Sequence, residues 1–288
     1  MSQQAPAHDA KVWLITGCSS GFGRELVLAA RKRGDLVVAT ARKIETLEEL
    51  KTLGCEVLAL DVTSDDATVN EVVAKAHAFY GRIDVLVNNA GQGAAGAIEE
   101  ASTEDIQAAF DVNVFGLVRV TRAVLPYMRE KRSGVIANIG SAAGYSPFPP
   151  VAVYGAAKYA VAGFSLALRM EVESFGIKVT VIEPTMFKTN GNASAKIFAN
   201  HIAEYDAAKQ ARMGSLAGKF VVGDAAKAAQ AMVEALTQSG RCTGREIPSR
   251  LAMGGGSYEL CDVTLAHAKK ELDEWKDFTT AEMYALEE

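Results

Sequence analysis

The sequence of 288 residues lacks the features that mark several large classes of protein. Its four cysteines show no Cys-x-x-Cys spacing and no accompanying pair of histidines: Cys18, Cys55, Cys242 and Cys261. We therefore predict no metal site and no disulfide framework, and we expect a reducing, cytoplasmic location. The first ten residues lack the basic-then-apolar pattern of a secretory signal, and no apolar run approaches the length of a membrane span.

An excess of positive charge is also absent, since the formal net charge is −5. The basic clusters at 31–33 and 129–132 stand where helices are expected to end, and there they complement the helix dipole. Without a basic stripe, the sequence predicts no nucleic-acid partner. What remains is a chain that is 49% hydrophobic and long enough for a large core.

Short apolar runs alternate with helical patterns along the first 182 residues. We predict strands at 11–16, 36–40, 56–60, 83–87, 134–139 and 177–182, and helices at 24–33, 45–53, 65–80, 103–127 and 153–175. Such alternation predicts right-handed βαβ units, and nearly continuous apolar strands indicate helices on both faces. The predicted fold class is α/β, with a single Rossmann-type, doubly wound parallel sheet of about seven strands.

The alternation stops between residues 186 and 222, where we predict no strand and one helical stretch around 195–212. A helix at 224–237, a short last strand at 245–247 and a charged, mostly helical tail at 258–288 follow. Because no linker separates these parts, we predict one domain over residues 1–288. It carries a flexible leader at 1–10 and a helical insertion at 186–222 that serves as a lid over the substrate.

A glycine-rich turn, TGCSSGFG at 16–23, lies between the first predicted strand and the first helix. Glycines at 17, 21 and 23 permit a tight turn, close approach of the backbone to a diphosphate, and close packing of helix on strand. The helix N-terminus then presents free N–H groups to the anion. The sequence therefore predicts a dinucleotide-binding domain.

The end of the second predicted strand indicates which dinucleotide is bound. A fold that prefers NAD usually has a carboxylate there, whereas this chain has Ala41 followed by Arg42. A guanidinium can pair with a 2′-phosphate, so we predict NADP(H). The alternative is that Arg42 and Lys43 are only the solvated start of the next helix.

Tyr154 and Lys158 stand four residues apart in a predicted helix, and so they share one face. An ammonium there favours the phenolate and is expected to lower the tyrosine pKa. Such a tyrosine can exchange a proton with an alcohol or a carbonyl. Ser141, at the end of an apolar run, can hydrogen-bond the same substrate oxygen. The alternative is a chance pair on a solvated helix.

Taken together and in order, these motifs resemble the short-chain dehydrogenase/reductase superfamily over residues 11–247. The resemblance rests on TGCSSGFG at 16–23, Asp61-Val62, NNAG at 88–91, Asn113 in VNVFG, Ser141 and YGAAK at 154–158. The step of thirteen residues from Ser141 to Tyr154 also fits the family. One position departs from it, since Pro184-Thr185 stands where the family has Pro-Gly. Threonine resists positive φ, so we expect a differently shaped turn there.

The resemblance implies an NADP(H)-dependent oxidoreductase that interconverts a ketone or an aldehyde and an alcohol. Tyr154 would be the general acid/base, Lys158 would lower its pKa and bind the nicotinamide ribose, and Ser141 would polarise the carbonyl. Asn113 would hold a water in a proton relay. The implied cofactor-binding residues are Gly17, Ser19, Ser20, Gly21, Phe22, Gly23, Arg42, Asp61, Val62, Asn88, Ala90, Gly91, Tyr154, Lys158, Pro184 and Thr189. The alternative for each of these residues is a purely structural role in a turn, a helix cap or a loop.

The substrate is expected to be a small molecule, namely a bulky, hydrophobic carbonyl compound or alcohol; the alternative is that the apolar residues below only pack the lid onto the body. The loop at 145–151 is apolar and holds three prolines, and the insertion adds four apolar residues: Met186, Phe187, Ile197 and Phe198. Three alternatives stay open: an NAD-linked alcohol dehydrogenase, a non-catalytic binding protein, and a non-redox biosynthetic enzyme on the same fold. The resemblance also implies a homodimer or homotetramer, and the tail from Tyr258 could cover the site or pack on a partner.

Overall fold

The computed structural model describes residues 10–189, 195–216 and 221–279. Nearly all of the predicted leader, and parts of the predicted lid and tail, lie outside these ranges. The chain forms a seven-stranded, all-parallel sheet in the order β3-β2-β1-β4-β6-β7-β9. The strand order reverses between β1 and β4, which is where ligands bind in open α/β sheets.

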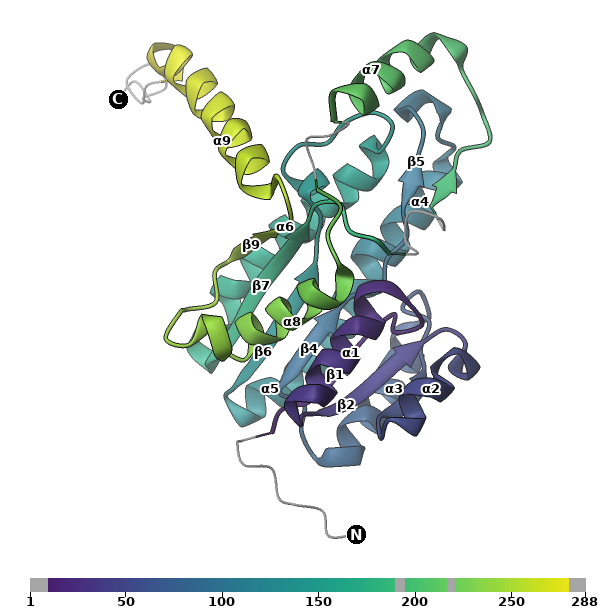
Figure 1. Cartoon of the computed structure of the whole chain (residues 1–288), viewed down its shortest axis with the longest axis vertical. Coiled ribbons are helices and arrows are strands. Elements are labelled where there is room, and N and C mark those ends of the chain that lie inside the picture. Colours follow the sequence, from purple (N-terminus) through teal and green to yellow (C-terminus); the bar gives the residue numbers. More distant parts are fainter. Residues whose placement is uncertain (1–9, 190–194, 217–220, 280–288) are drawn as a thin grey trace, which may run out of the picture.

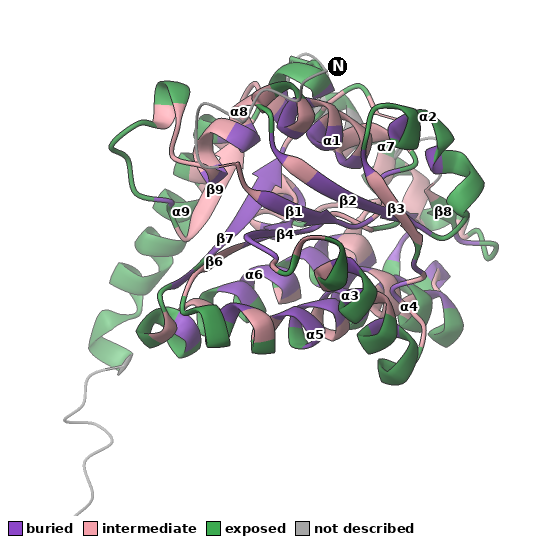
Figure 2. Cartoon of the chain, turned by 90° about the horizontal axis from the view of Figure 1, so that it is seen from below, coloured by how far each residue is buried: buried purple, intermediate pink, exposed green. Residues whose placement is uncertain are grey.

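The strands and helices alternate as the sequence predicts. The strands are β1 Val12–Ile15, β2 Leu36–Ala41, β3 Glu56–Ala59, β4 Val85–Asn88, β6 Gly134–Ile139, β7 Ile177–Pro184 and β9 Arg250–Met253. One face is covered by α1 Gly21–Arg33, α2 Glu48–Thr52 and α8 Ala225–Leu236, and the other by α3 Asp66–Tyr80, α5 Gly116–Lys131 and α6 Ala152–Val172. Figure 2 shows the buried sheet between these two layers. The predicted fold class is confirmed.

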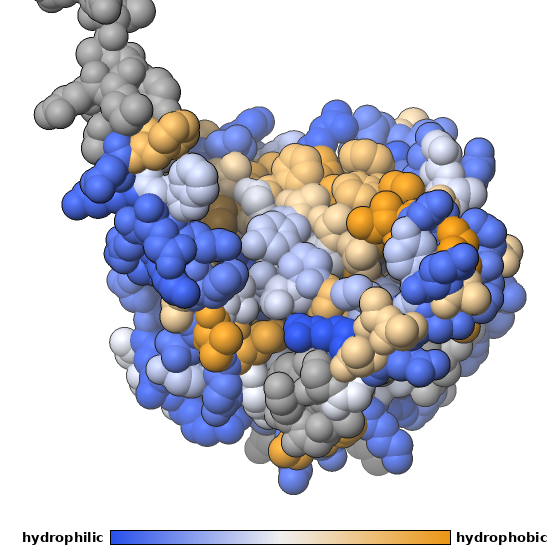
Figure 3. All heavy atoms as spheres, turned by 90° about the horizontal axis from the view of Figure 1, so that it is seen from above, coloured by the Kyte–Doolittle hydropathy of each residue, from blue (hydrophilic) through white to orange (hydrophobic). Residues whose placement is uncertain are grey.

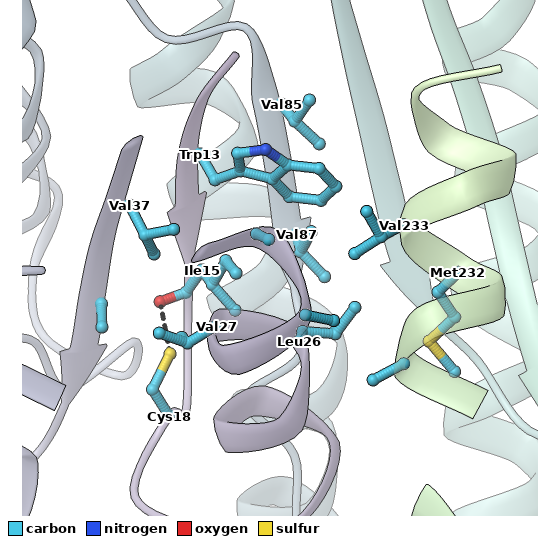
Figure 4. Close-up of a cluster of buried hydrophobic side chains, with 14 of the residues drawn as sticks. Trp13, Ile15, Cys18, Leu26, Val27, Val37, Val85, Val87, Met232 and Val233 are labelled. Carbon is cyan, nitrogen blue, oxygen red and sulfur yellow. Dashed lines mark hydrogen bonds between the residues drawn. The ribbon is translucent and has the colours of Figure 1, made fainter. Parts of the chain in front are cut away.

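The core follows from the period of two in the strands. Trp13 and Ile15 of β1 enter one buried cluster, while Leu14 between them enters the cluster on the opposite face. Figure 4 shows Trp13 and Ile15 facing Leu26 of α1 and Met232 of α8. The indole N–H of Trp13 donates to the carboxylate of Asp35 over 2.9 Å, so the one polar atom of the ring is satisfied. Apolar side chains therefore fill both faces of the strand.

Three predicted elements are wrong. The long helix at 103–127 is divided into α4 Thr103–Phe110, a π-helical turn at Asp111–Phe115, and α5, which continues past Pro126 to Lys131. The last strand lies at Arg250–Met253 and not at 245–247, because the apolar residues that pair with the end of β7 come later. The insertion does contain a strand, β8 Lys196–Ile197, which pairs with β5 Ala94–Ala95, and its helix α7 begins only at Asp206 and ends at Leu216.

The tail begins as the helix α9 Ser257–Glu274, which projects from the body (Figure 1). Its first turns lie near β9 and the turn after Ser141, and the rest is exposed. Within the described ranges, every helix is too short or too polar to cross a lipid bilayer.

Candidate active site

The glycine-rich turn after β1 has the conformation that only glycine adopts easily. Gly17 and Gly21 have φ values of +70° and +57°. A Cβ built on Gly23 would lie 2.3 Å from the carbonyl oxygen of Gly17, so a side chain cannot be placed there without moving the backbone. The turn is therefore closed on itself, and α1 packs directly against it.

The N-terminus of α1 is left open to an anion. Ser20 is the N-cap but its side chain makes no capping hydrogen bond, and the first turn of α1 carries no acidic residue. The first N–H groups of a helix lack helical partners, and the helix dipole favours negative charge there. The exposed Ser19 and the half-buried Phe22 flank this end. These features fit the diphosphate of a dinucleotide.

The turn after β4 supports the glycine-rich turn through a residue that the sequence analysis missed. The side-chain amide of Asn89 donates to the carbonyl oxygens of Thr16 and Gly17 over 2.8 and 3.0 Å. The hydroxyl of Thr16 accepts from the backbone N–H groups of Asn89 and Ala90, both over 3.0 Å. The NNAG motif was the available signal, but the prediction named only the first of its two asparagines.

Asn88 points away from the site. Its amide donates to Thr121 over 2.9 Å and to Asn138 over 2.8 Å in the buried interior. Asn138 in turn donates to Ser165 of α6 over 2.9 Å. Asn88 therefore stabilises the wall of the site from behind, by joining β4, β6, α5 and α6.

The residues predicted to hold the far end of a dinucleotide lie at the ends of β2 and β3. Arg42 is exposed directly after β2, and no carboxylate occupies the position of Ala41. The carboxylate of Asp61 accepts from the N–H and hydroxyl of Thr63 over 2.9 and 2.8 Å. Val62 is buried, and it packs against Gly116 at the start of α5. This end of the site thus has an exposed cation and an ordered turn.

The structure brings Ser141, Tyr154 and Lys158 together. Ser141 accepts from the N–H of Ala143 over 3.2 Å, and its side chain is near enough to Tyr154 to influence the pKa of the phenol. Lys158 is 4% exposed, and its ammonium lies 5.6 Å from the centre of the Tyr154 ring. The ammonium donates to the carbonyl oxygen of Ile139 over 2.8 Å. That bond fixes the lysine against the end of β6, just before Ser141.

Burial dominates the electrostatics of this group. It raises the pKa of Tyr154, and the hydrogen bond with Ser141 offsets part of the rise. It also lowers the pKa of Lys158 to about 8. The expected lowering of the Tyr154 pKa by the ammonium is therefore wrong for this structure, because burial removes the phenolate from water and is the largest influence on this group.

Asn113 lies in the π-helical turn between α4 and α5. Its side chain accepts from the N–H of Gln92 over 3.2 Å and donates to the carbonyl oxygens of Gln92 and Ala109, both over 2.9 Å. A Cβ built on Gly91 would lie 2.9 Å from Asn113 Oδ1 and 3.6 Å from Lys158 Nζ. Asn113 and Lys158 thus approach the same exposed glycine. Single π-helical turns are frequent at functional sites.

A partly buried ion pair, also missed, supports the turn that carries Ser141. Glu183 of β7 is fully buried, and it binds Arg250 of β9 through both carboxylate oxygens, one of them over 2.8 Å. The Arg250 guanidinium lies 3.5 Å from the centre of the Tyr145 ring and donates to the carbonyl oxygen of Gly144 over 3.2 Å. Burial raises the pKa of Glu183, and the hydrogen bond from Arg250 offsets part of it. The two charges are 67 residues apart, so no local pattern marks them.

In the Pro184-Thr185 turn after β7, the threonine side chain hydrogen-bonds the backbone at the end of β9. Pro184 is buried as the last residue of β7. The Thr185 hydroxyl donates to the carbonyl oxygens of Met253 and Gly255, both at 3.2 Å. Among the described residues, only Arg132 and Gln238 are non-glycines with positive φ, so Thr185 avoids the strained conformation. The turn therefore differs from a Pro-Gly turn in that the Thr185 hydroxyl links the ends of β7 and β9 by hydrogen bonds, which a glycine could not do.

The predicted substrate-side residues divide into two groups. Phe198 is buried in a cluster with Ala94 and Val153, and Tyr154 packs against this cluster. Phe187 instead contacts Phe22, with ring centres 5.2 Å apart. Thr189 lies beside Gly21, since a Cβ built there would be 3.4 Å from the threonine Cβ. Met186 and Ile197 are exposed.

Comparisons with known proteins agree with this geometry. The family model for short chain dehydrogenase matches residues 11–214. Oxidoreductase BOA17 of Botryotinia fuckeliana is 36% identical over 277 residues, which cover 94% of this chain and 98% of that protein. A short-chain dehydrogenase from Streptomyces avermitilis of known structure is 40% identical with a TM-score of 0.85, over 95% of this chain and 98% of that one.

A relative whose name states its cofactor is also similar. NADP-dependent 3-hydroxy acid dehydrogenase YdfG of Escherichia coli is 40% identical over 205 residues, which cover 66% of this chain and 82% of that protein. Other similar solved structures hold either NADP or NAD. The sheet, the glycine-rich turn and these matches lead to one conclusion: the chain belongs to the short-chain dehydrogenase/reductase superfamily, a family of oxidoreductases.

Proposed function

We propose that the protein interconverts a ketone or an aldehyde and an alcohol with NADP(H), at the site formed by Ser141, Tyr154, Lys158 and Asn113. The observation that carries the proposal is the convergence of these side chains on the turns that follow β4 and β6, the first of which is hydrogen-bonded to the glycine-rich turn. Ser141 lies near enough to Tyr154 to influence its pKa, and Lys158 and Asn113 both approach Gly91. A proton donor, a carbonyl-binding hydroxyl and a buried cation thus meet at the switch point of the sheet.

The nicotinamide, when bound, supplies or accepts the hydride. In the direction of reduction, Tyr154 gives its phenolic proton to the carbonyl oxygen, and the raised pKa keeps that proton in place until charge develops there. The Ser141 hydroxyl stabilises the same oxygen. Lys158 stabilises the resulting phenolate by its charge, and Asn113 holds the water through which the proton returns. The charge of the buried lysine therefore stabilises the phenolate that forms during the reaction more than it stabilises the neutral phenol of the resting enzyme.

The choice of NADP(H) over NAD(H) rests on Arg42 and on the absence of a carboxylate at Ala41. A guanidinium there attracts a 2′-phosphate, whereas a carboxylate would accept a ribose hydroxyl. The Escherichia coli relative is named as NADP-dependent, which also favours this choice. An NAD-linked alcohol dehydrogenase is the second candidate, because similar structures hold NAD.

The substrate is proposed to be a hydrophobic carbonyl compound or alcohol. Tyr154 lies in an apolar cluster with Val153 and Phe198. Beside α7, a cavity of about 270 Å³ is lined mostly by apolar residues: Ala97, Ile98, Glu99, Pro149, Ala152, Tyr205, Ala208 and Lys209. Hydrophobic residues also gather on the face at the α7 and α9 end of the molecule (Figure 3). Apolar walls with few polar anchors suit such a ligand.

A homodimer or homotetramer is part of the proposal. Four large apolar side chains of α6 are exposed: Tyr159, Phe164, Leu166 and Met170. By helical periodicity, Tyr159, Leu166 and Met170 lie on one face of the helix. A contiguous apolar face on a helix is typical of an interface between subunits.

The test is turnover of a panel of hydrophobic ketones with NADPH by wild type, Tyr154→Phe and Tyr159→Phe. Tyr159 is an exposed tyrosine on the same helix, and so it is the matched control. We expect Tyr154→Phe to lose at least about 100-fold in kcat, the contribution of a general acid, while NADPH binding survives. Near-normal turnover by Tyr154→Phe would remove it as the acid/base. Product formation without a change in nicotinamide absorbance would favour a non-redox enzyme.

A further inference from the structure

The described part of the insertion, residues 195–216 (called the lid below), is docked on residues 93–105 of the body. The backbone N–H of Lys196 donates to the carbonyl oxygen of Gly93 over 2.9 Å, and that of Phe198 donates to the carbonyl oxygen of Ala95 over 3.0 Å. A Cβ built on Gly96 would lie 2.2 Å from the Phe198 ring, so the ring rests directly on the backbone. The lid therefore has a defined seat on the body.

Glu100 joins the lid to this seat through a buried charge. The residue is 3% exposed. One carboxylate oxygen accepts from the N–H of Ala97 over 2.7 Å, and the other accepts from the N–H of Ile202 over 2.9 Å and from the Lys209 ammonium over 2.6 Å. Two of these three donors belong to the lid. A buried carboxylate is costly unless it is paired and hydrogen-bonded, so Glu100 strongly favours the docked lid.

The seat is also connected to the catalytic helix. The N–H of Gly96 donates to the carbonyl oxygen of Pro150 over 2.7 Å, just before α6 begins. Tyr154 packs against the buried cluster that contains Phe198 of the lid. The position of the lid thus sets the apolar space beside the tyrosine.

We propose that Glu100 is a positioning residue that holds the lid closed over Tyr154, so that the substrate pocket is formed before the substrate arrives. The link to substrate rests on the proposed function, whereas the hold on the lid does not. Glutamine cannot replace the glutamate, because both carboxylate oxygens accept hydrogen bonds from N–H donors. The NH₂ group of a glutamine at position 100 would face one of those donors.

The first test needs no turnover. Trypsin cleavage after Arg212 of α7 requires local opening of the lid, and mass spectrometry gives its rate. We expect Glu100→Gln to be cleaved about tenfold faster than wild type, which corresponds to the loss of one charged hydrogen bond. Glu104→Gln, an exposed glutamate on α4, is the matched control and should cleave as wild type does. Equal rates for Glu100→Gln and wild type would overturn the proposal.

A double-mutant cycle tests whether Lys209 is the partner. Trypsin should also cleave Lys209→Gln after Arg212 faster than wild type. The double variant should be cleaved no faster than the single variant that is cleaved faster. Fully additive effects would overturn the pairing.

In turnover, we expect Glu100→Gln to raise KM for the ketone about tenfold while kcat stays within about twofold and NADPH affinity is unchanged. Faster cleavage with an unchanged KM would overturn the role in forming the pocket. If wild type is inactive with every ketone but the cleavage rates differ as expected, the proposed function fails while the hold of Glu100 on the lid stands.

Discussion

Replacing Lys158 with methionine should remove a pH dependence of the unliganded protein's stability that arises from the burial of this lysine. Methionine keeps much of the aliphatic length and removes the charge. Burial lowers the Lys158 pKa from 10.5 to about 8. Below pH 8 the lysine is charged in both states, but in the folded protein the charge is buried, whereas in the unfolded chain it is in water.

The sign and size follow from that shift. Between pH 8 and 10.5 the unfolded chain holds a proton that the folded protein has released, so this group makes folding more favourable as pH rises. The shift corresponds to about 3 kcal/mol of destabilisation at pH 7. About 2 kcal/mol of it is relieved by pH 9.5. Lys158→Met removes the whole effect but leaves the carbonyl oxygen of Ile139 without its donor, a loss of about 1–3 kcal/mol that does not vary with pH.

Urea unfolding at several pH values separates the two contributions. The free energy of unfolding of Lys158→Met, minus that of wild type, should fall by about 2 kcal/mol between pH 7 and pH 9.5. Lys75→Met, at an exposed position on α3, should show no such fall. A difference that stays constant for Lys158→Met would mean that the lysine titrates normally, and the reasoning from burial would be refuted.

Three further variants test the site and its support. Gly23→Ala should weaken NADPH binding at least about tenfold, because its Cβ would strike the Gly17 carbonyl; unchanged affinity in a fluorescence titration would contradict this. Arg250→Met should cost about 3 kcal/mol in urea unfolding, since it leaves Glu183 buried and unpaired; an unchanged midpoint would speak against it. Thr185→Gly should cost about 1–2 kcal/mol through its lost hydrogen bonds, whereas equal stability would show that these hydrogen bonds are unimportant.

The sheet and most of its helices could be predicted because their signals are local. Apolar runs such as 177–182 specify buried parallel strands, and Gly34 and Gly81 end α1 and α3 in the left-handed conformation. The strand β9 was misplaced because it is short and its partner, the end of β7, is distant in sequence. The two-residue strand β8 is too short to show any period.

The candidate site divides in the same way. Ser141, Tyr154, Lys158 and the glycine-rich turn were found because they form compact motifs. The Glu183–Arg250 pair and the Glu100–Lys209 pair were not, because each forms only when the chain folds. The pKa of Tyr154 was predicted in the wrong direction since sequence shows the neighbouring charge but not the burial that outweighs it.

The most direct test of the central claim is a titration of the purified protein with NADPH and NADH separately, followed by nicotinamide fluorescence. Wild type should bind NADPH more tightly. Arg42→Ala should lose that preference, by about tenfold in NADPH affinity with NADH unchanged, as expected for one charged contact. Lys43→Ala, at the next exposed position, is the control and should keep the preference. Tighter binding of NADH by wild type would contradict the cofactor assignment, and binding of neither would contradict the oxidoreductase itself.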